Sequence, residues 1–576
     1  MENTEIGEIF YEIGELLEVL GENKFKVRAY YKGAEVISSY PYDLRDIYNK
    51  DGVNGLLEIK GIGKGLAEKI EEHVKTGNIQ YINELKKKLP PGILELLRVQ
   101  SVGPKKAKLF YEKLGIKDLS SLEKAANENK LRELPGMGEK SEKSIIRSLV
   151  FLKKDKGRIL LGAALPLGEL LVASLSRMKE VSKVEYAGSL RRGKETIGDI
   201  DILAASKKPE EVIKYFCGLS EFASILSKGP TKAAAVTKNG VQVDLRVIEL
   251  STFGAALNYF TGSKDHNIKL REIAIKKGLK LSEYGLTREK DKKNIASETE
   301  ESIYKTLGLS YIPPELREDR GEIELAAKQK MPELLRLSDI KGDLHMHTDA
   351  SDGVETLEDM IKAARSKGYE YIAVTDHSES LKVANGLSGK RLLARVKEIS
   401  KINSKLKGFR ILAGSEVDIK PDGTLDYDPE VHESLDYAIG SVHTNFGMSR
   451  EEMTKRVINA IKSGKITTLG HPSGRVIGQR EAYAIDLIEV IKAAKDYNVA
   501  IELSAHPMRL DLTDIYCKVA KEKGVKIAIS TDAHTLGELD MMKYGVITAR
   551  RGWLEKKNVL NCLAVKDLIE FLKKRK

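Results

Sequence analysis

The sequence DLHMHTDASDG, residues 343–353, is the first of six short runs that each look like a strand ending in a metal-binding side chain. The other five are AVTDH (373–377), LAGSEVD (412–418), IGSVH (439–443), TLGHP (468–472) and ISTDAH (529–534). Helices of ~10–15 residues are expected between them, which indicates a parallel βα architecture. A βα barrel gathers its βα loops on one face, so these side chains are expected to lie together there. Imidazole and carboxylate together suit zinc, manganese or iron, and isolated core histidines would not explain six such strand ends.

The composition narrows the class of protein. The chain has 576 residues, too many for one hydrophobic core, so about three to five domains are expected. A net charge of +11 favours a polyanionic partner such as nucleic acid, although a lysine-rich solvated surface would give the same value. Three widely separated cysteines argue against a disulfide framework, and the acidic, amphipathic N-terminus is not a signal peptide. No apolar run approaches a membrane span, so a cytoplasmic, nucleoid-associated protein without membrane contact is expected.

The first 150 residues have apolar residues at helical spacing and repeat one unit three times. In each copy a glycine-containing turn precedes a lysine-rich helix: IKGIGKGLAEKI (59–70), VQSVGPKKAKLF (99–110) and LPGMGEKSEKSI (134–145). Such a turn exposes backbone N–H groups at a helix start, where they suit a phosphate oxygen. The turns resemble helix-hairpin-helix motifs, although Ser101 replaces the first glycine of the second copy. Contacts with the DNA backbone are therefore expected from Gly61, Gly63, Lys64, Gly103, Lys105, Gly136, Gly138 and Lys140.

Three aspartates stand out between residues 155 and 255, where strands and helices mix. GDIDIL (198–203) places Asp199 and Asp201 two residues apart, so both carboxylates face the same side of a strand. Asp244 belongs to VQVDLRV (241–247), a second alternating strand that could run alongside. Three converging carboxylates repel one another unless cations bind between them, and two divalent ions there would clamp a triphosphate and activate a primer 3′-hydroxyl. The D-x-D pattern alone would favour exposed aspartates on an edge strand.

Two flanking motifs reverse that preference. GSLRRG (188–193) offers close backbone approach, a hydroxyl group and an arginine fork for phosphate, and YFTGSKDHNIKLR (259–271) follows downstream. In this order and spacing, the motifs of residues 1–316 resemble those of the family X DNA polymerases, of which DNA polymerase beta is the familiar member. With its C-terminal half, the whole chain resembles the bacterial and archaeal family X polymerases that carry a PHP domain.

The resemblance implies a role for each matching residue of the polymerase part. The carboxylates that would hold two Mg²⁺ or Mn²⁺ ions for catalysis are Asp199, Asp201 and Asp244. The residues that would bind the triphosphate are Ser189, Arg192 and Gly198. The residues that would contact the sugar and base of the incoming nucleotide, or the template, are Tyr259, Phe260, Gly262, Asn267 and Arg271.

Lys69, in GIGKGLAEKI, matches the position of the family's Schiff-base lysine. In members with 5′-deoxyribose-phosphate lyase activity, that amine attacks the open sugar aldehyde, which requires a lowered pKa. The cations that could lower this pKa, or could instead bind the 5′-phosphate, are Lys24, Lys26, Arg28 and Lys64. Gly65 stands where polymerase beta has a lysine, so the sequence leaves open whether Lys69 forms a Schiff base or only contacts a phosphate.

The PHP resemblance covers residues 339–576 and implies a distorted seven-stranded βα barrel holding up to three Zn²⁺ or Mn²⁺ ions. The residues that match its ligand pattern are His345, His347, Asp352, His377, Glu416, His443, His471, Asp532 and His534. The implied groups are His345/His347/Glu416/Asp532, Glu416/His443/His471 and Asp352/His377/His534. The family parallels are 3′–5′ exonuclease, 3′-phosphatase or phosphodiesterase, and abasic-site endonuclease activities. His506 stands where the family often has Asn, and we expect it to contact substrate, not metal.

The sequence therefore predicts a multidomain α/β enzyme. Its expected parts are a helical helix-hairpin-helix, lyase-like domain (1–88), helix-hairpin-helix fingers (89–154), a polymerase beta-like nucleotidyltransferase palm of α+β type (155–255), a thumb (256–316), a linker (317–338) and a distorted (β/α)7 PHP barrel (339–576). The predicted function is gap filling in base excision-like DNA repair by a monomer that uses gapped or nicked DNA and dNTPs, and that also hydrolyses DNA 3′ ends. The alternatives are a PHP domain acting as a small-molecule phosphatase, a non-catalytic DNA-binding scaffold, and template-independent nucleotidyl transfer.

Overall fold

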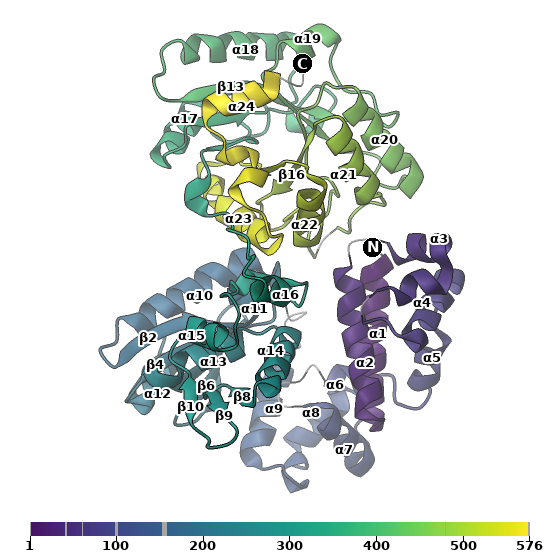
Figure 1. Ribbon diagram of the computed structural model, residues 1–576, viewed down its shortest axis with the longest axis vertical. Helices are drawn as coiled ribbons and strands as arrows, with labels where there is room; N and C mark the ends of the chain where they lie inside the picture. The colour runs from purple at the N-terminus through teal and green to yellow at the C-terminus, as the bar shows by residue number, and fades with distance from the viewer. Residues whose placement is uncertain are drawn as a thin grey trace. The chain divides into compact units, whose positions relative to one another are not determined.

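The computed structural model describes residues 2–40, 43–59, 61–97, 99, 102–152, 158–478 and 480–573 (Figure 1). The chain divides into two compact units. The first contains Met1–Arg158 and Pro209–Arg246, and the second contains Ile159–Lys208 and Val247–Lys576. Within the described ranges, no helix combines the length and apolar character that crossing a bilayer requires.

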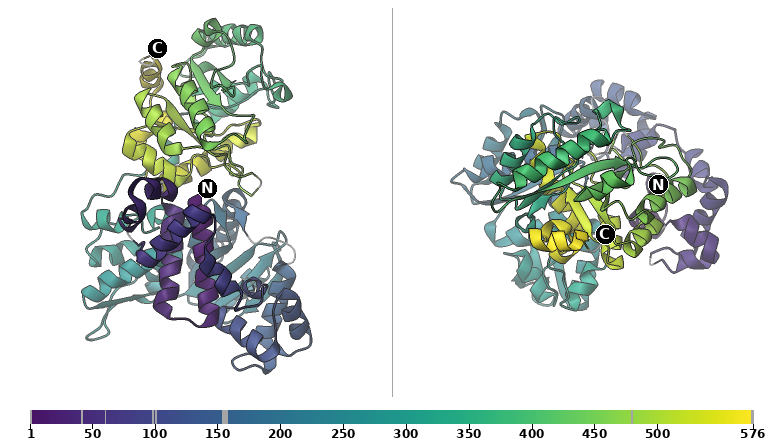
Figure 2. Two further views of the ribbon diagram at one scale, coloured as in Figure 1. Left: turned by 90° about the vertical axis from the view of Figure 1, so that its right-hand side faces the viewer. Right: turned by 90° about the horizontal axis from the view of Figure 1, so that it is seen from above.

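The first unit begins with five helices around one apolar core. They are α1 (Glu2–Leu20), α2 (Lys24–Ser39), α3 (Leu44–Leu57), α4 (Lys64–Thr76) and α5 (Gln80–Lys86). The long helices α1 and α2 lie side by side (Figure 2) and bury Phe10, Leu17 and Ile37 completely. Helix α4 buries Leu66 and Ile70, which are spaced by one helical turn, so Lys64 and Lys75 remain in solvent.

A second group of helices follows with a core of its own, which includes Phe110, Leu122 and Ile145. These helices are α6 (Ile93–Leu96), α7 (Pro104–Leu114), α8 (Leu119–Asn127), the 3-10 turn η1 (Leu131–Glu133) and α9 (Glu139–Leu152). The unit is completed by α12 (Pro209–Cys217) and by three antiparallel strands, β5 (Phe222–Lys228), β6 (Lys232–Thr237) and β7 (Gln242–Ile248). The predicted helix-hairpin-helix character of the N-terminal region agrees with this arrangement.

The second unit opens with the elements around GSLRRG and GDIDIL. They are β1 (Ile159–Leu160), α10 (Leu161–Ser176), β2 (Val181–Tyr186), α11 (Gly188–Arg191), β3 (Thr196–Ile197) and β4 (Asp199–Ser206). Strand β4 pairs antiparallel with β2, and the short strand β1 pairs antiparallel with β3. Residues 202–206 of β4 are buried, whereas its first residues, which carry the aspartates, are more accessible.

Next come two helices, a small sheet and three short helical segments. These are α13 (Phe253–Thr261), α14 (Lys264–Lys276), β8 (Leu279–Ser282), β9 (Gly285–Arg288), β10 (Asn294–Ala296), α15 (Glu300–Thr306), η3 (Pro314–Leu316) and α16 (Glu322–Ala327). The sheet has the order β10-β9-β8. One core joins Leu270, Tyr304, Ile323 and the barrel residue Trp553, so residues expected as a linker pack closely here.

The remainder of the unit is a parallel barrel of seven strands in sequence order. The strands are β11 (Gly342–Asp343), β12 (Tyr371–Val374), β13 (Arg410–Asp418), β14 (Tyr437–Ser441), β15 (Thr468–Leu469), β16 (Ala500–Ser504) and β17 (Ile527–Ser530). A parallel bridge between Met346 and Ala533 links the first strand to the last, which nearly closes the barrel. The helices are α17 (Leu357–Ser366), α18 (Gly389–Asn403), α19 (Pro429–Glu433), α20 (Arg450–Lys462), α21 (Leu487–Asp496), α22 (Asp514–Lys523), α23 (Met542–Arg551) and α24 (Val565–Lys573).

The barrel strands are almost continuously buried, as strands covered on both faces must be. This burial explains why the sequence shows apolar runs here instead of an alternating pattern. The predicted fold class is confirmed, including the seven-stranded barrel.

Candidate active sites

The nine predicted ligands of the barrel all lie at the carboxyl ends of its strands. The ligands outside regular strands follow β11, β12, β14, β15 and β17, and Glu416 lies near the end of β13. His345, His347 and Glu416 are almost completely buried, whereas the side chains of Asp352 and His534 are about one-third exposed. The barrel topology therefore brings together residues that are up to 189 positions apart in the sequence, from His345 to His534.

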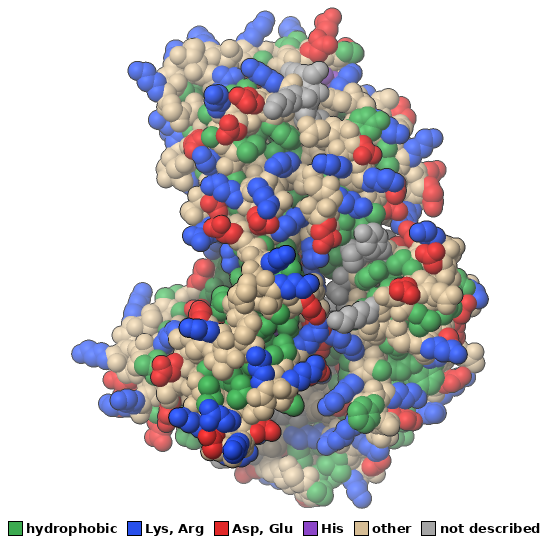
Figure 3. Space-filling view, viewed as in Figure 1, with side chains coloured by type: hydrophobic (Ala, Val, Ile, Leu, Met, Phe, Trp, Pro, Cys, Tyr) green, Lys and Arg blue, Asp and Glu red, His purple; other side chains and the backbone are tan. Residues whose placement is uncertain are grey.

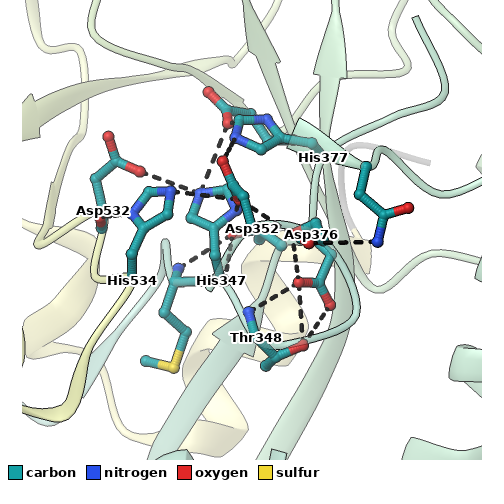
Figure 4. Close-up of polar contacts among 12 residues, drawn as sticks. His347, Thr348, Asp352, Asp376, His377, Asp532 and His534 are labelled. Atoms are coloured by element: carbon teal, nitrogen blue, oxygen red, sulfur yellow. Dashed lines mark hydrogen bonds and ion pairs between the residues drawn. The ribbon is translucent and has the colours of Figure 1, made fainter. Parts of the chain in front are cut away.

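These side chains form three overlapping groups in which one potential ligand atom per residue lies within 4.8 Å of the others. The groups are His345/His347/Glu416/Asp532, His347/Asp352/His377/His534 and His377/Glu416/His443. Figure 4 shows the second group, with Asp352 between His347, His377 and His534. The first group has the members that the resemblance implied. His471 belongs to none of the three, although its Nε2 atom lies 3.0 Å from Oε1 of Glu416.

Buried atoms without partners indicate that this cluster is built for cations. Among the described residues, Nδ1 of His347 and of His471 are buried without a hydrogen bond, and Nδ1 of His377 has only Oε2 of Glu416 beside it, at 2.9 Å. Leaving such atoms unsatisfied costs about 1–3 kcal/mol each, so a ligand is expected to satisfy part of them. The donor set of imidazoles and carboxylates fits Zn²⁺ or Mn²⁺.

The electrostatics of the cluster agree with this fit. Burial lowers the pKa of His347 to about 4, and the neighbouring His377 adds to the effect. Burial also opposes charge on His377, but Glu416 and Asp352 raise its pKa to about 10. The carboxylates therefore stabilise positive charge inside the barrel, and a bound divalent cation supplies such charge.

Further carboxylates, which the sequence motifs did not predict, orient two of the histidines. His345 Nδ1 is 2.7 Å from Oε1 of Glu502, whose Oε2 accepts a hydrogen bond from the backbone N–H of His471 at 2.6 Å. Asp418 lies 2.6 Å from Nδ1 of His443. Such partners fix the imidazole tautomer and direct the other ring nitrogen to the ion. The sequence does indicate a role for Asp418. In EVD at 416–418, two acidic residues are spaced two apart, as in DID at 199–201.

His506 lies beyond the end of β16, outside the three groups, and its Nδ1 accepts a hydrogen bond from the backbone N–H of Met508. Arg509 follows, with Nε 4.0 Å from Oδ2 of Asp532 and Nη1 buried without a partner. Arg475 behaves differently, because its Nη2 donates to Glu195 at 2.6 Å. Among the described residues, Arg509 therefore keeps a guanidinium nitrogen without a partner close to the cluster.

A second pocket, in the polymerase part of the same unit, gathers most of the predicted nucleotide contacts. Its lining includes Gly188, Ser189, Arg192, Asp199, Asp201, Tyr259, Phe260, Gly262, Asn267 and Arg271. Gly198 immediately precedes Asp199, and Asn267 Nδ2 donates to the carbonyl of Tyr259 at 2.7 Å. The structure therefore places GSLRRG, GDIDIL and YFTGS at one site.

Glycine is required at the start of this site. Gly188 has a φ of +60°, and a Cβ atom there would collide with the Asp201 carboxylate. Arg192 lies beside it: Nε donates to Oε1 of Glu318 at 3.1 Å, and Nη1 donates to the carbonyl of Thr261 at 2.5 Å. These contacts hold the guanidinium at the pocket, where its remaining nitrogen can meet a phosphate oxygen.

Asp244, the third predicted carboxylate, lies on β7 in the first unit, and its Oδ2 accepts a hydrogen bond from Nε2 of Gln242 at 2.9 Å. Strand β7 pairs with β6, where Asp244 is opposite Ala234. Asp244 is only partly buried, so its carboxylate retains access to a ligand.

The predicted helix-hairpin-helix turns are exposed. Gly63 and Gly103 are the N-cap residues of α4 and α7 and provide no side-chain cap, and a Cβ atom at either position would meet no atom within 4 Å. Gly61 and Gly136 have φ values of +102° and +74°. A phosphate can therefore approach the backbone N–H groups at these helix starts.

The charged side chains near these turns are also accessible. Lys64 and Lys105 are exposed, Gly138 is open to solvent, and the side chain of Lys140 is outside the described part of the chain. Lys and Arg are spread over the face drawn in Figure 3 among Asp and Glu, without one dominant patch. Lys69 is half-buried, with Nζ 4.8 Å from the centre of the Tyr81 ring. Nζ of Lys26 lies 5.0 Å from the same centre.

Family models match four parts of the chain. A helix-hairpin-helix domain model matches residues 1–79, and a SAM-like helix-hairpin-helix tandem matches residues 93–150. A DNA polymerase beta thumb model matches residues 256–318, and a PHP domain model matches residues 343–506.

Curated relatives match either the barrel region or the whole chain. A probable phosphatase of Thermoanaerobacter sp. is 31% identical over 245 residues, which cover 41% of this chain and 95% of the relative. A probable phosphatase of Vibrio parahaemolyticus is 30% identical over 35% of this chain and 82% of the relative. The DNA polymerase/3′-5′ exonuclease PolX of Bacillus subtilis is 39% identical over the full length of both chains. This full-length match confirms the resemblance predicted from the motifs, and the chain belongs to the PolX family of DNA polymerases with a PHP domain.

Proposed function

We propose that this protein is a DNA-directed DNA polymerase that fills short gaps during DNA repair and processes DNA 3′ ends with its PHP barrel. The observation that carries the proposal is the presence of two chemically different sites in one chain: an aspartate-lined pocket and a buried imidazole–carboxylate cluster. The full-length similarity to a protein named polymerase and 3′-5′ exonuclease supports the pairing of these two activities.

As the family resemblance implies, Asp199, Asp201 and Asp244 would each offer a carboxylate oxygen to Mg²⁺ or Mn²⁺ in the polymerase site. Bound ions of this kind neutralise triphosphate charge and favour in-line attack by the primer hydroxyl. Ser189, Arg192 and Gly198 would receive the triphosphate of a dNTP. Tyr259, Phe260 and Gly262 would pack against its sugar, and Asn267 and Arg271 would reach the nascent base pair.

In the barrel, nine residues would hold up to three Zn²⁺ or Mn²⁺ ions: His345, His347, Asp352, His377, Glu416, His443, His471, Asp532 and His534. Such ions lower the pKa of bound water and neutralise a phosphodiester. Arg509 would hold a phosphate oxygen at the open side of the cluster, and Glu502 and Asp418 would keep two histidines in the ligand tautomer. The main product would be a shortened DNA 3′ end, with abasic-site cleavage as a further activity of the same site.

The DNA partner would be a gapped or nicked duplex held through backbone phosphates. The exposed turns at Gly61–Gly63, Gly103 and Gly136–Gly138 support this mode, and Lys64, Lys105 and Lys140 would add charge. Lys69 would act as a Schiff-base lysine or as a phosphate contact in the same region. We further propose that the protein acts as a monomer in the cytoplasm, associated with the nucleoid.

One alternative has specific support. The barrel resembles proteins named probable phosphatases, so it could act on a small phosphate monoester. The cluster chemistry is the same for both substrates. Testing a small phosphate ester beside labelled DNA distinguishes them, and we expect DNA hydrolysis to be the faster reaction.

The deciding experiment uses a labelled one-nucleotide gap with a matched or blocked 3′ end, in Mg²⁺ and Mn²⁺ separately. We expect Asp199→Ala with Asp201→Ala to abolish nucleotide addition and to retain 3′-end hydrolysis. We expect His345→Ala with His347→Ala to have the opposite effect. Simultaneous loss of both activities in each folded variant would contradict two separate sites.

Incubation with each single dNTP tests templated synthesis. We expect only the dNTP complementary to the template base to be added. Indiscriminate addition would favour template-independent nucleotidyl transfer.

A further inference from the structure

A buried network of ion pairs joins the GSLRRG turn to the PHP barrel. Glu318 follows η3, and its Oε1 accepts hydrogen bonds from Nε of Arg192 and from Nη1 of Arg551, each at 3.1 Å. Arg551 ends helix α23 of the barrel, and its Nη2 also donates to Oδ2 of Asp514 at 2.8 Å. Arg320 donates to the same oxygen at 2.9 Å. Glu318 is therefore shared by a predicted nucleotide-binding arginine and a barrel arginine.

The network is shielded from water and fully charged. The side chains of Glu318 and Arg551 are 7% and 5% exposed. Burial would raise the pKa of Glu318, but Arg551 and Arg192 hold it well below its usual value. Removing one partner from a buried ion pair is costly, because the other charge is left without compensation. Loss of Arg551 would therefore leave part of the charge on Glu318 without compensation and would alter the pairing of Glu318 with Arg192.

The backbone of the turn is held from the same side. Nη1 of Arg551 donates to the carbonyl of Arg192 at 2.6 Å. Gly193 has a φ of +64° and lies against Ile547 of α23 so closely that a Cβ atom would collide with this side chain. Helix α23 therefore touches both the peptide backbone and the ion-pair partner of Arg192.

These contacts set the direction of the Arg192 side chain. Nε is held by Glu318 and Nη1 by the carbonyl of Thr261, whereas Nη2 has no hydrogen-bond partner among the described residues. The pocket that Arg192 lines also contains Ser189, Asp199 and Asp201. A planar guanidinium fixed at two nitrogens presents the third in one direction only, which favours phosphate binding.

We infer that Arg551, a residue of the PHP barrel, is a positioning residue for nucleotide binding in the polymerase site. Together with Glu318 it orients Arg192 toward the triphosphate of the incoming dNTP. This inference rests on the proposed polymerase function and assigns part of that function to the barrel.

The test compares Arg551→Gln with Arg550→Gln in the full-length protein. Arg550 is the preceding residue of α23 and also crosses to the polymerase part, but its partner is Glu315, at 2.7 Å, and it does not contact Arg192. On a one-nucleotide gap, we expect Arg551→Gln to raise the KM for dNTP roughly tenfold, with kcat changed less, because a charge-assisted contact is lost. We expect Arg550→Gln to keep the wild-type KM. Affinity for gapped DNA and 3′-end hydrolysis should be alike in both variants.

A double-mutant cycle separates positioning from a general structural effect. In an Arg192→Ala background, Arg551→Gln should change the KM for dNTP by less than about twofold, because the residue that it positions is absent. Arg551→Lys keeps a cation beside Glu318 but lacks the planar fork, so an intermediate KM is expected. If Arg551→Gln does not fold, a wild-type KM in Arg551→Lys would overturn the inference.

Failure of the inference differs from failure of the proposed function. If the wild-type chain adds no nucleotide to the gap, the polymerase function is wrong. If the wild-type chain adds nucleotides and both α23 variants have equal KM values, only the positioning role of Arg551 is wrong. An equal increase in KM with and without Arg192 would also overturn it.

Discussion

At the scale of single residues, each site depends on a residue whose atoms cannot shift or be replaced without moving a predicted ligand. Gly188 is the clearest case, because its positive φ and its approach to Asp201 each exclude a side chain. Glu502 has the corresponding place in the barrel, where one carboxylate orients His345 and fixes the backbone of His471. Substitutions at these positions should affect one activity and spare the other.

Gly188→Ala should reduce nucleotide addition. The new methyl group must displace the Asp201 carboxylate or the turn, and a misplacement of about 1 Å can lower a rate on the order of 100-fold. Measured on a one-nucleotide gap, kcat/KM should fall by about that factor, while 3′-end hydrolysis stays at the wild-type rate. Gly447→Ala is the control, since Gly447 is exposed and a Cβ atom there would contact nothing. Full polymerase activity in Gly188→Ala would show that Asp201 does not need this position.

Glu502→Gln should weaken metal binding in the barrel. The substitution removes the negative charge beside Nδ1 of His345, and changes of this kind typically cost about 10–100-fold in metal affinity. A Mn²⁺ titration of 3′-end hydrolysis should show the increase as a higher half-saturating concentration. Glu489→Gln, on the exposed side of α21, should leave the titration unchanged. An unaltered titration for Glu502→Gln would exclude the orienting role.

At the scale of elements, the sequence predicted the helices and strands whose periodicity or motif lies within one short stretch of residues. The alternation in GDIDIL predicted strand β4, and the apolar runs predicted the buried strands of the barrel together with their polar ends. Glu502 was not found, because it lies within the run AIELS and its partner His345 is 157 residues away. Residues 317–338 read as a charged linker, yet Arg317 is completely buried in an ion pair with Glu300 and Glu322 is completely buried against His266, contacts that no local pattern reveals.

Helix α14 carries a buried histidine whose contacts with distant residues should depend on pH. His266 is completely buried between Glu322 of α16 and Tyr304 of α15, at 2.7 and 2.8 Å. Burial lowers its pKa, with Arg317 adding to this and Glu322 and Asp319 opposing it. The folded state therefore favours the neutral ring. The stability that His266 contributes to the folded state is complete above the unfolded pKa of about 6.5. It is lost as the pH falls below that value, by up to about 1.4 kcal/mol per pH unit.

His266→Gln should therefore make thermal unfolding less sensitive to acid. The loss in Tm between pH 7.5 and pH 5.5 should be smaller in the variant than in the wild type, even if the variant is less stable at pH 7.5. Tyr304→Phe is a matched control, because it removes one hydrogen bond of His266 and keeps the titrating ring. An equal loss in Tm for wild type and His266→Gln would show that His266 does not titrate in this range.

At the scale of the whole molecule, the chain combines two sets of candidate metal ligands with exposed helix-hairpin-helix turns. Matching motifs identified both halves from the sequence, but the contacts between the GSLRRG region and the barrel were not predictable. Glu318 and Arg551 are 233 residues apart, and Glu195 and Arg475 are 280 residues apart. Complementary charges at such separations have many equivalent pairings in a chain with 96 basic and 85 acidic residues, so only the fold selects one.

DNA binding should depend strongly on salt, because the exposed turns offer backbone N–H groups and lysines to phosphates. The logarithm of the association constant should fall linearly with the logarithm of salt concentration, with a slope of about −0.9 per phosphate contact. Removing Lys64 and Lys105 together, as Lys64→Gln with Lys105→Gln, should reduce this slope by about two, since each contact contributes about one unit.

The matched control for that experiment is Lys401→Gln, an exposed lysine of barrel helix α18, which should leave the slope unchanged. Fluorescence anisotropy with a gapped duplex gives the association constants, and changing the duplex sequence should not alter them, because phosphate contacts carry no sequence information. A slope near zero in the wild type would contradict the backbone mode of binding. A reduction in the Lys401→Gln variant equal to that of the turn variant would show that net charge, and not the helix-hairpin-helix turns, determines affinity.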